Sequence, residues 1–382
     1  MSTNSPLKTI QDGLVLYFDN NNPKSYIGEP TTNLNSDPLG LSGNPGSVTW
    51  GGYEYNITRT NDLPIPSMAE ISPYWIKCVC NGPSSGRAAV LGVSGLSTGV
   101  DYCISCYVYS SNSNITTVGW NSHNSGVSTD SSAVTYGSSD TLSVKRIYRI
   151  FRSVAGSQLE VLQTNTSVIS GDTFYVTGIQ CEQKSYPTQL VNGNRSATQG
   201  LVDLTKTNTI NLSNTAFDSN ARITFNNSTS YINTGCILNG STYTKFAWFN
   251  TNNLSAANNI VSGGTNGQHA FWLAVGNKLN AGHNGSWSTV QSSTTISTNT
   301  WYFGAASFST STGWRLYLNG SMEASSVSTT TFTGTTMPTL IGSYDYGNLF
   351  SGTIDMVGIY NKVLSDADVL QLYLRTKSRY RL

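Results

Sequence analysis

Residues 314–320 read Trp-Arg-Leu-Tyr-Leu-Asn-Gly, and the fold class that we predict for this chain starts from this stretch. The large apolar residues Trp, Leu and Leu occupy alternate positions, with Arg and Tyr between them. This is the two-residue period of a half-buried β-strand. Asn319-Gly320 is a pair that a type I′ hairpin turn favours, because both of its central positions need a positive φ. A return strand is therefore expected from Ser321 onward.

The surrounding sequence repeats the pattern of strand and turn. Strand-like runs include Trp301–Phe303 and Phe350–Asp355, and six Asn-Gly pairs with clusters of Ser, Thr and Gly punctuate the whole chain. Closely spaced turn signals of this kind favour an all-β sandwich. Ser365 followed by Asp368 is a capping-box pattern, which predicts one short helix from Ser365 to Leu374.

The order of strand, Asn-Gly hairpin, Gly352-Thr-Ile-Asp355 strand and short capped helix resembles the end of a laminin-G/concanavalin-A-like jelly roll. The resemblance implies an all-β fold of jelly-roll sandwiches with a short C-terminal helix. It also implies a recognition scaffold, so that binding or assembly is expected before catalysis. A fold by itself does not dictate function.

The composition limits the classes of partner. Only 11% of the 382 residues are charged, under half of the usual share of about 25%, and the formal net charge is +1. Nothing in this balance attracts nucleic acid or an acidic membrane surface. A polar but nearly uncharged exterior suits a long-lived assembly, and a homo-oligomer is expected.

Neither a leader nor a membrane span is predicted. Met1–Ser5 has no basic start followed by an apolar run, and no window approaches the roughly 18 apolar residues of a spanning helix. We therefore expect synthesis in the cytoplasm without a signal peptide, and no membrane insertion.

Six cysteines raise the questions of zinc and disulfides; they are Cys78, Cys80, Cys103, Cys106, Cys181 and Cys236. The two close pairs fall inside apparent strands and not on the turns that present thiolates to zinc. On a strand, Cys78 and Cys80 share a face, whereas Cys103 and Cys106 are split between faces. Buried free thiols are the favoured interpretation, with zinc and disulfides as the alternatives.

The domain organisation is inferred from a predicted strand near the start of the sequence, because the stretches that should follow it in the same domain come far downstream. Gly13–Tyr26 resembles the opening strand of laminin-G-like domains in structural proteins of tailed phages, but the matching Asp203-Leu204 and Ser230–Ile232 come far downstream. We therefore predict a discontinuous domain of residues 1–30 and 193–382 with an inserted domain of residues 31–192. Insertion into a loop is tolerated because closure entropy grows slowly with loop length. The alternative is an N-terminal arm followed by two consecutive domains.

The inserted segment carries a motif of its own. The predicted strand Phe174–Glu182 ends in Gln-x-Glu and is followed by Tyr186-Pro187-Thr188, where proline stops the strand. This pattern resembles the end of carbohydrate-binding-module-like jelly rolls in phage fibres and structural proteins, and it implies a second β-sandwich.

No catalytic residues are predicted. Glycosidases need two carboxylates at a defined separation, and the acids from Asp203 onward form no Glu-x-Asp-x-x-Glu strand motif. The three histidines, His123, His269 and His283, have no metalloprotease spacing. A polysaccharide-degrading enzyme is therefore the least favoured reading of the fold.

Binding residues are predicted from aromatic and oxygen-rich loops. Aromatic rings stack on sugar faces and offer a polar edge, and the loop candidates for glycan contact are His283, Trp287, Tyr344 and Tyr346. Lectin-like sandwiches often hold calcium through carboxylate and amide oxygens, and the candidates are Asp19, Asp345 and Asn348. The same residue types are ordinary turn formers. No other cofactor is predicted.

The C-terminal sequence is basic against a nearly uncharged body. Arg375, Lys377, Arg379 and Arg381 alternate with other residues and are candidates for docking on an acidic partner, with a solvated terminus as the alternative.

Taken together, the pairing of laminin-G-like and carbohydrate-binding-like jelly rolls resembles virion structural proteins of tailed bacteriophages. The resemblance implies a non-enzymatic protein of the virion surface that decorates the capsid or tail, binds other virion proteins and is made in the host cytoplasm. The alternative is a host-attachment adhesin that binds cell-surface glycans.

Overall fold

The computed structural model describes residues 11–35, 48–50, 55–81, 87–122, 128–154, 157–191, 193–218, 220–238, 240–274, 276–332 and 336–380. Within these residues the chain is nearly all β, with one α-helix, α1 (Asp366–Thr376), near the C-terminus. This confirms the predicted fold class. No helix in this part of the chain is long and apolar enough to cross a membrane.

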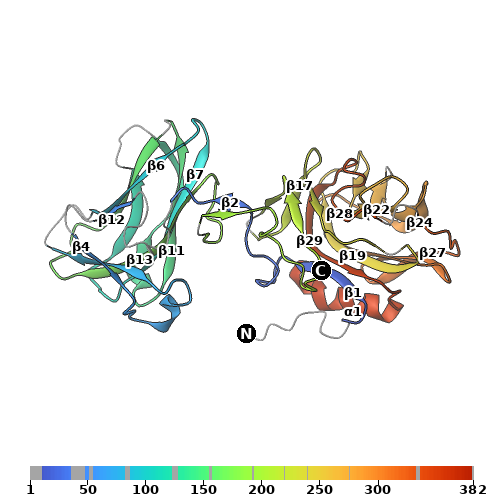
Figure 1. Ribbon diagram of the computed structural model, residues 1–382, viewed down its shortest axis with the longest axis horizontal. Coiled ribbons are helices and arrows are strands. Elements are labelled where there is room, and N and C mark those ends of the chain that lie inside the picture. Colours follow the sequence, from blue (N-terminus) through green and yellow to red (C-terminus); the bar gives the residue numbers. More distant parts are fainter. Residues whose placement is uncertain are drawn as a thin grey trace. The chain divides into compact units, whose positions relative to one another are not determined.

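The chain divides into two compact units (Figure 1). Unit 1 combines Met1–Pro30 with Ser196–Leu382, and unit 2 is Thr31–Arg195. The first boundary is the one expected from the sequence, and the second lies three residues beyond it.

Unit 1 is built on an eight-stranded antiparallel sheet. Its strands are β1 (Leu14–Asp19), β16 (Ala216–Phe217), β17 (Ile223–Asn226), β19 (Thr242–Thr251), β25 (Tyr302–Ser309), β26 (Gly313–Leu318), β27 (Ser321–Ser326) and β29 (Ser351–Tyr360).

Strand β29 is the centre of this sheet. It pairs with β19 on one side, and on the other side with β17 and then with β1. In the β1 register, Phe18 lies opposite Val357 and Asp19 opposite Met356. The first strand of the unit is therefore hydrogen-bonded to its last strand.

Two four-stranded sheets form the second layer of unit 1. One contains β15 (Asn211–Ser213), β18 (Tyr231–Asn233), β28 (Thr339–Ile341) and β21 (Val261–Gly263), and the other β20 (Asn258–Asn259), β22 (His269–Ala274), β23 (Lys278–His283) and β24 (Ser286–Thr295). Side chains from both layers, such as Phe249 and Phe308 from the large sheet and Phe271 and Leu273 from β22, share one buried core. This is the sandwich core.

The hairpin and the helix form as the sequence predicts. Asn319 and Gly320 have φ values of 48° and 82°, and they join Leu318 to Ser321 in the register of a two-residue turn. At the helix, the Asp368 backbone N–H donates to Ser365 Oγ at 3.1 Å, while the Ser365 backbone N–H donates to the Asp368 carboxylate at 3.1 Å. The predicted capping box is confirmed.

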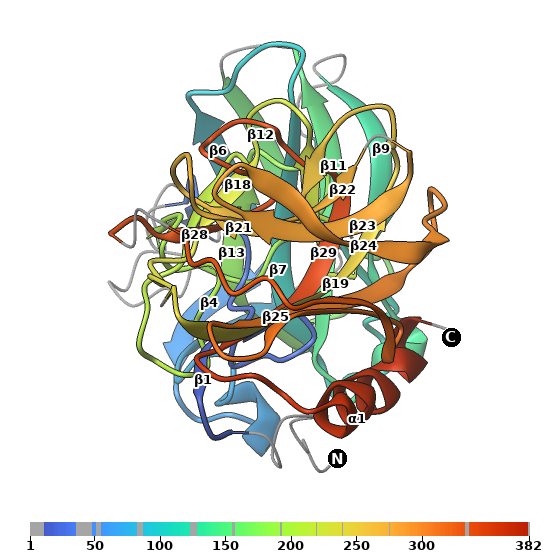
Figure 2. The ribbon, with the colours of Figure 1, turned by 90° about the vertical axis from the view of Figure 1, so that its right-hand side faces the viewer.

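The large sheet of unit 1 is buried on both faces. On the face away from the sandwich core, α1 and the 3₁₀ turn η3 (Lys377–Tyr380) pack on a second cluster that includes Trp248, Phe303 and Tyr317. Figure 2 shows α1 on the opposite side of this sheet from β23 and β24. The strand that was expected to be half-buried is therefore buried on its Tyr317 face too, because α1 covers Tyr317 and the Tyr317 hydroxyl donates to Asp366 at 2.8 Å.

Unit 2 is a sandwich of two antiparallel sheets. One contains β3 (Val48–Trp50), β6 (Arg87–Ser94), β8 (Thr117–Ser122), β10 (Tyr136–Gly137) and β12 (Ser157–Thr164), and the other β4 (Tyr55–Thr60), β5 (Trp75–Cys80), β7 (Asp101–Tyr109), β9 (Ser128–Val134), β11 (Lys145–Ser153) and β13 (Thr173–Glu182). A short pair, β2 (Thr31–Thr32) with β14 (Asn194–Arg195), closes the unit, and η1 (Pro66–Met68) and η2 (Ser138–Asp140) lie in its loops.

The cysteines are free thiols in buried positions. Cys78 and Cys80 both point into the core of unit 2, as does Cys106, while Cys103 is buried outside that cluster. The strand-face assignment made from the sequence agrees with this arrangement.

Candidate functional site

An aromatic pocket lies in unit 1, where the β20–β22–β23–β24 sheet meets the loop after β28. The pocket has a volume of about 200 Å³ and is lined by Ala257, Asn259, Ala270, Trp272, Trp287, Tyr344 and Asn348. Two of these, Trp287 and Tyr344, are predicted glycan-contact residues, and Asn348 is a predicted calcium ligand. The fold brings the three together from positions up to 61 residues apart in the sequence.

The two tryptophans are positioned by strand alternation and by one hydrogen bond. On β22, Phe271 and Leu273 are buried in the sandwich core, so Trp272 between them faces outward and is partly exposed. Its indole Nε1–H donates to the backbone oxygen of Trp287 at 2.9 Å. Sequence reasoning missed Trp272, although its place between two core residues of a strand is the signal that identifies an outward-facing ring.

Tyr344 lines the pocket beside Trp287. Its ring centroid lies 5.1 Å from that of Trp287, with the planes at 61°. The Tyr344 hydroxyl accepts a hydrogen bond from the Gly267 backbone N–H at 3.0 Å and donates to Asn266 Oδ1 at 3.3 Å. Partial burial raises the pKa of this phenol, so it stays protonated at neutral pH. The edge-to-face contact and the two hydrogen bonds fix the ring.

A tight turn carries Tyr344 and Asn348. The Tyr344 backbone N–H donates to the Gly347 oxygen at 3.0 Å and the Gly347 N–H to the Tyr344 oxygen at 2.9 Å. Between them, Asp345 and Tyr346 have φ values of 51° and 56°. Two consecutive non-glycine residues in this region store strain of about 1–3 kcal/mol each. Strain of this kind is concentrated at binding and catalytic sites.

Tyr346 itself is not a wall of the pocket. It is 42% exposed, and its ring packs edge-on against Tyr231 at 5.3 Å. Among the four predicted glycan residues, the structure therefore places Trp287 and Tyr344 together and Tyr346 on the neighbouring surface.

His283 is a correction to the sequence interpretation. It ends β23, is 3% exposed, and its ring lies 4.8 Å from the rings of both Phe308 and Trp314. Its Nε2 contacts the backbone oxygen of Thr330. Burial lowers the pKa of this imidazole. His283 belongs to the sandwich core and is closed to a ligand at the surface.

The polar edge of the pocket comes from two asparagines. Asn259 Nδ2 donates to the backbone oxygen of Asn348 at 2.9 Å, and Asn259 Oδ1 accepts from Ser262 at 2.9 Å, so the Asn259 amide is committed. The exposed side-chain amide of Asn348 makes no hydrogen bond to the described residues. This amide is therefore able to hydrogen-bond a ligand in the pocket.

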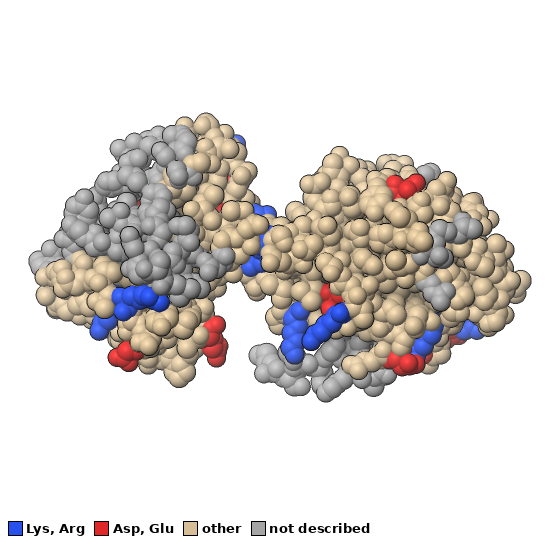
Figure 3. Space-filling model, viewed as in Figure 1, with Lys and Arg blue, Asp and Glu red and all other residues tan. Residues whose placement is uncertain are grey.

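A second, wider hollow adjoins the pocket. It has a volume of about 650 Å³ and is lined by Trp272, Gly285, Ser286, Trp287, Ser288, Thr289 and Ser328. Trp272 and Trp287 line both spaces. On the face shown in Figure 3, charged side chains are few and separated, and most of the described surface is neither acidic nor basic.

The predicted calcium ligands lie in two different places. Asp19, on β1, is 1% exposed, and its carboxylate accepts hydrogen bonds from Arg379, Tyr17 and the Asn21 backbone. This corrects its assignment, because a guanidinium takes the position that a cation would need. Asp345 and Asn348 lie in the Tyr344–Gly347 turn and directly after it. No group of three or more His, Cys, Asp or Glu in the described part of the chain is arranged to hold a metal ion.

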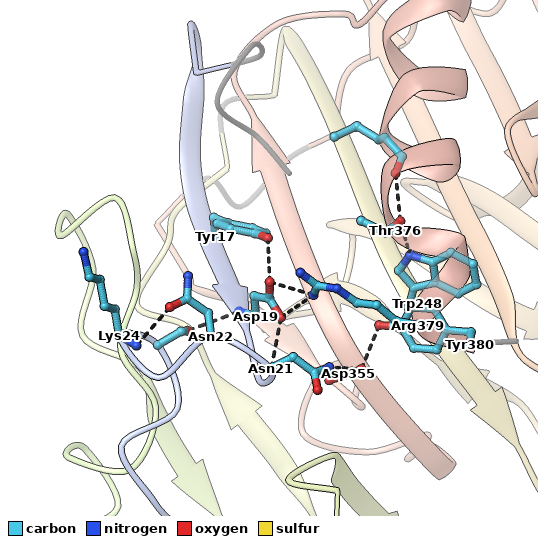
Figure 4. Close-up of polar contacts among 12 residues, drawn as sticks. Tyr17, Asp19, Asn21, Asn22, Lys24, Trp248, Asp355, Thr376, Arg379 and Tyr380 are labelled. Carbon is cyan, nitrogen blue, oxygen red and sulfur yellow. Dashed lines mark hydrogen bonds and ion pairs between the residues drawn. The ribbon is translucent and has the colours of Figure 1, made fainter. Parts of the chain in front are cut away.

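The basic tail docks on its own unit. Figure 4 shows Arg379 reaching Asp19 on β1 and Tyr380 reaching Asp355 on β29. The Tyr380 hydroxyl donates to Asp355 at 2.7 Å, and its ring stacks on Trp248 at 4.0 Å. Arg379 is therefore not available for an acidic partner, which corrects that part of the docking prediction. Arg375 is exposed, the Lys377 ammonium lies 5.7 Å from the Tyr373 ring, and Arg381 lies outside the described residues.

Two acids meet in this network. Asp19 and Asp355 come from β1 and β29, and Asn21 bonds both, through its backbone N–H and its side-chain amide. Burial raises the pKa of Asp355 to about 6. Both carboxylates are almost fully buried and are hydrogen-bonded to Arg379 or Tyr380 of η3, so a substrate has no direct access to them.

Comparisons with known proteins agree with the fold of unit 1. Residues 217–370 match the family model of the concanavalin A-like lectin/glucanases superfamily. Together with the sheets described above, this defines a laminin-G/concanavalin-A-like jelly roll. No curated protein matches the sequence of this chain.

Three solved structures are similar to part of this chain at low sequence identity. A sialidase of Trypanosoma rangeli in complex with an inhibitor is 14% identical with a TM-score of 0.38, over 47% of this chain and 31% of the sialidase. Domain 4 of an extracellular arabinanase from Geobacillus stearothermophilus, in complex with arabinotriose, is 20% identical with a TM-score of 0.37, over 47% and 93% of the two chains. The Ruminococcus gnavus IT-sialidase CBM40 bound to α2,3 sialyllactose is 14% identical with a TM-score of 0.32, over 35% and 83%.

Proposed function

We propose that this protein is a non-enzymatic carbohydrate-binding protein, and that unit 1 binds a glycan in the pocket that Trp272, Trp287 and Tyr344 line. The observation that carries the proposal is a pocket on a lectin-like sandwich that is lined by three aromatic rings and by the Asn348 amide, which is able to hydrogen-bond a ligand. Aromatic rings cover the apolar face of a sugar, while amides and hydroxyls bond its edges. The sealing of Asp19 and Asp355 beneath η3 supports the non-enzymatic part of the proposal.

A glycan array probed with the full chain tests this function. We expect binding to at least one glycan class, and a loss of at least about tenfold in affinity on Trp287→Ala, as for an aromatic residue at the centre of a binding site. Ile237→Ala is the matched control, because Ile237 is exposed on unit 1 but lies outside both hollows. Trp287→Phe, which keeps a ring, should retain part of the affinity. Absence of binding across the array contradicts the proposal.

We further infer that the glycan is on a host cell and that the protein sits on the surface of a tailed-bacteriophage virion, made in the host cytoplasm and held there by other virion proteins. The resemblance of both jelly rolls to virion proteins supports this setting. Immunoelectron microscopy of purified particles tests it: labelling of capsid or tail is expected, and unlabelled particles would contradict it.

A second candidate is a decorating role in which the sandwiches pack against virion proteins or further copies of this chain and bind no sugar. The low content of charged residues favours it, because such surfaces do not repel their neighbours. Crosslinking of intact particles followed by mass spectrometry distinguishes the two. Virion crosslinks together with an unchanged particle-to-cell affinity in the Trp287→Ala variant would favour decoration over attachment.

A further inference from the structure

The pocket and the wider hollow share both of their tryptophans, and this arrangement bears on the class of glycan. At about 200 Å³, the pocket is below the range of roughly 300–1,000 Å³ that holds a drug-sized ligand, so it suits one sugar ring. The adjoining hollow is about 650 Å³ and has room for more. Because Trp272 and Trp287 line both spaces, a ligand on these rings can contact both.

The linings of both spaces contain no Asp, Glu, Lys, Arg or His among the described residues. Sites for carboxylates and sulfates rely on arginine or lysine, because a charged group loses strong hydration on binding and needs a charged partner to replace it. Asp345, the exposed residue that follows Tyr344, is an acid and supplies no positive charge for an anionic sugar. The chemistry of the lining therefore favours uncharged sugars.

The wider hollow offers hydroxyl groups in place of charge. The side-chain hydroxyls of Ser286, Ser288 and Ser328 make no hydrogen bond to the described residues, so they are open to the hydroxyls of a second ring. Thr289 differs, because its Oγ1 donates to the Ser286 backbone oxygen at 2.8 Å. The serines line the wider hollow alone, whereas Trp272 and Trp287 line both spaces.

We propose that the ligand is a neutral oligosaccharide of at least two residues, with one ring in the pocket that Trp272, Trp287 and Tyr344 line and the next over Ser286, Ser288 and Ser328. This specificity rests on the proposed carbohydrate-binding function. It excludes sialylated, uronate-containing and sulfated glycans as the preferred class.

The test uses calorimetric titration of the full chain with uncharged hexose and N-acetylhexosamine oligomers of one to four residues, and with sialylated and uronate-containing oligomers of the same lengths. We expect neutral dimers to bind about tenfold more tightly than monomers, the effect of about 1.4 kcal/mol from the second ring. Affinity should be the same at about 0.05 and 0.5 M salt, because no charge pair is formed that salt could screen.

Two variants locate the second ring. Ser286→Trp fills the wider hollow and should reduce the affinity for oligomers to that for monomers. Thr312→Trp places the same bulk in an exposed turn elsewhere on unit 1 and should change nothing. Trp287→Ala should weaken monomers and oligomers alike.

The outcomes separate this inference from the function on which it rests. Binding of acidic glycans that is lost on Trp287→Ala leaves the carbohydrate-binding function standing and overturns the neutral specificity. Equal affinity for monomers and oligomers, or no effect of Ser286→Trp, overturns the two-ring arrangement. Failure to bind any sugar overturns both.

Discussion

Arg379 and Asp19 are 360 positions apart, yet Arg379 Nη1 lies 2.9 and 2.8 Å from the two carboxylate oxygens of Asp19. The pair fastens η3 to the first strand of unit 1, and Tyr380 beside it bonds Asp355 on the last strand. The C-terminal segment thus clamps β1 and β29 together at the point where they run side by side.

Replacing Arg379 should weaken this clamp. In Arg379→Gln, the carboxylate of Asp19 stays buried without its cation, and loss of one partner of a buried pair costs about 3–5 kcal/mol. Because the Arg379 side chain is 30% exposed, we expect the lower end, about 3 kcal/mol. Urea unfolding followed by hydrogen exchange of β29 peptides measures unit 1 alone. Lys24→Gln, at an exposed position of unit 1 whose side chain makes no hydrogen bond to the described residues, should shift stability by less than about 0.5 kcal/mol, and equal effects of the two variants would refute the clamp.

Asp355 should give unit 1 a dependence on pH. Burial raises its pKa from 3.8 to about 6, so between these values the folded state holds a proton that the unfolded state has lost. The stability from this group is complete below pH 3.8 and is lost as the pH rises through 6. The shift of about two units corresponds to about 3 kcal/mol.

Comparison with Asp355→Asn isolates this group, because an amide does not titrate and the other acids are common to both proteins. The stability of the variant relative to the native protein should rise by about 3 kcal/mol between pH 3.5 and 7. A difference that stays constant over this range would show that Asp355 does not hold the extra proton.

The cysteines should be unreactive in the folded protein. All six are buried, and burial raises the pKa of thiols such as Cys78 and Cys181 well above the ordinary value. Because the thiolate is the reactive form, an aromatic disulfide reagent at pH 8 should modify fewer than one thiol per chain, and all six in urea. Rapid modification of the folded chain would contradict the buried placement.

A side chain added at Gly320 in the hairpin turn should destabilise unit 1 by more than the positive φ of this residue alone explains. Gly320 and Gly276 both have positive φ, but a Cβ on Gly320 would lie 2.9 Å from the Tyr373 ring, whereas a Cβ on Gly276 meets nothing within 4 Å. Gly276→Ala should lower the free energy of unfolding only by the cost of a positive φ at an L-residue, about 1–2 kcal/mol. Gly320→Ala should cost more and should speed hydrogen exchange in α1. If the two variants lose the same free energy of unfolding, α1 moves away from the added methyl group without loss of stability, and the prediction is wrong.

Local signals in the sequence predict much of the fold. The Asn319-Gly320 turn and the Ser365–Asp368 cap are fixed by neighbouring residues, and both are confirmed. The predicted strand Phe174–Glu182 agrees with β13 to within one residue. In each case the interaction that determines the conformation lies within a few positions of the residues that form it.

The sites were harder to predict because they depend on distant pairings. No residue near Asp19 in the sequence indicates that Asp19 lies close to Arg379 and Asp355. Only the pairing of β1 with β29 brings these residues together. His283 looked like a loop residue because Asn284-Gly285 follows it. Its alternation with the buried Leu279 and Ala281 was the available evidence that it faces inward. The same alternation, applied to β22, would have predicted that Trp272 faces outward.

The pairing of β1 with β29 also bears on how the chain is made. During synthesis, β1 leaves the ribosome more than 300 residues before its partner, while every strand of unit 2 lies between Thr31 and Arg195 and can pair at once. Since domains fold as units while translation proceeds, unit 2 is complete first. Until β29 and η3 emerge, β1 lacks the strand with which it pairs. Its apolar side chains Leu16 and Phe18 then remain exposed, and chaperones can bind them.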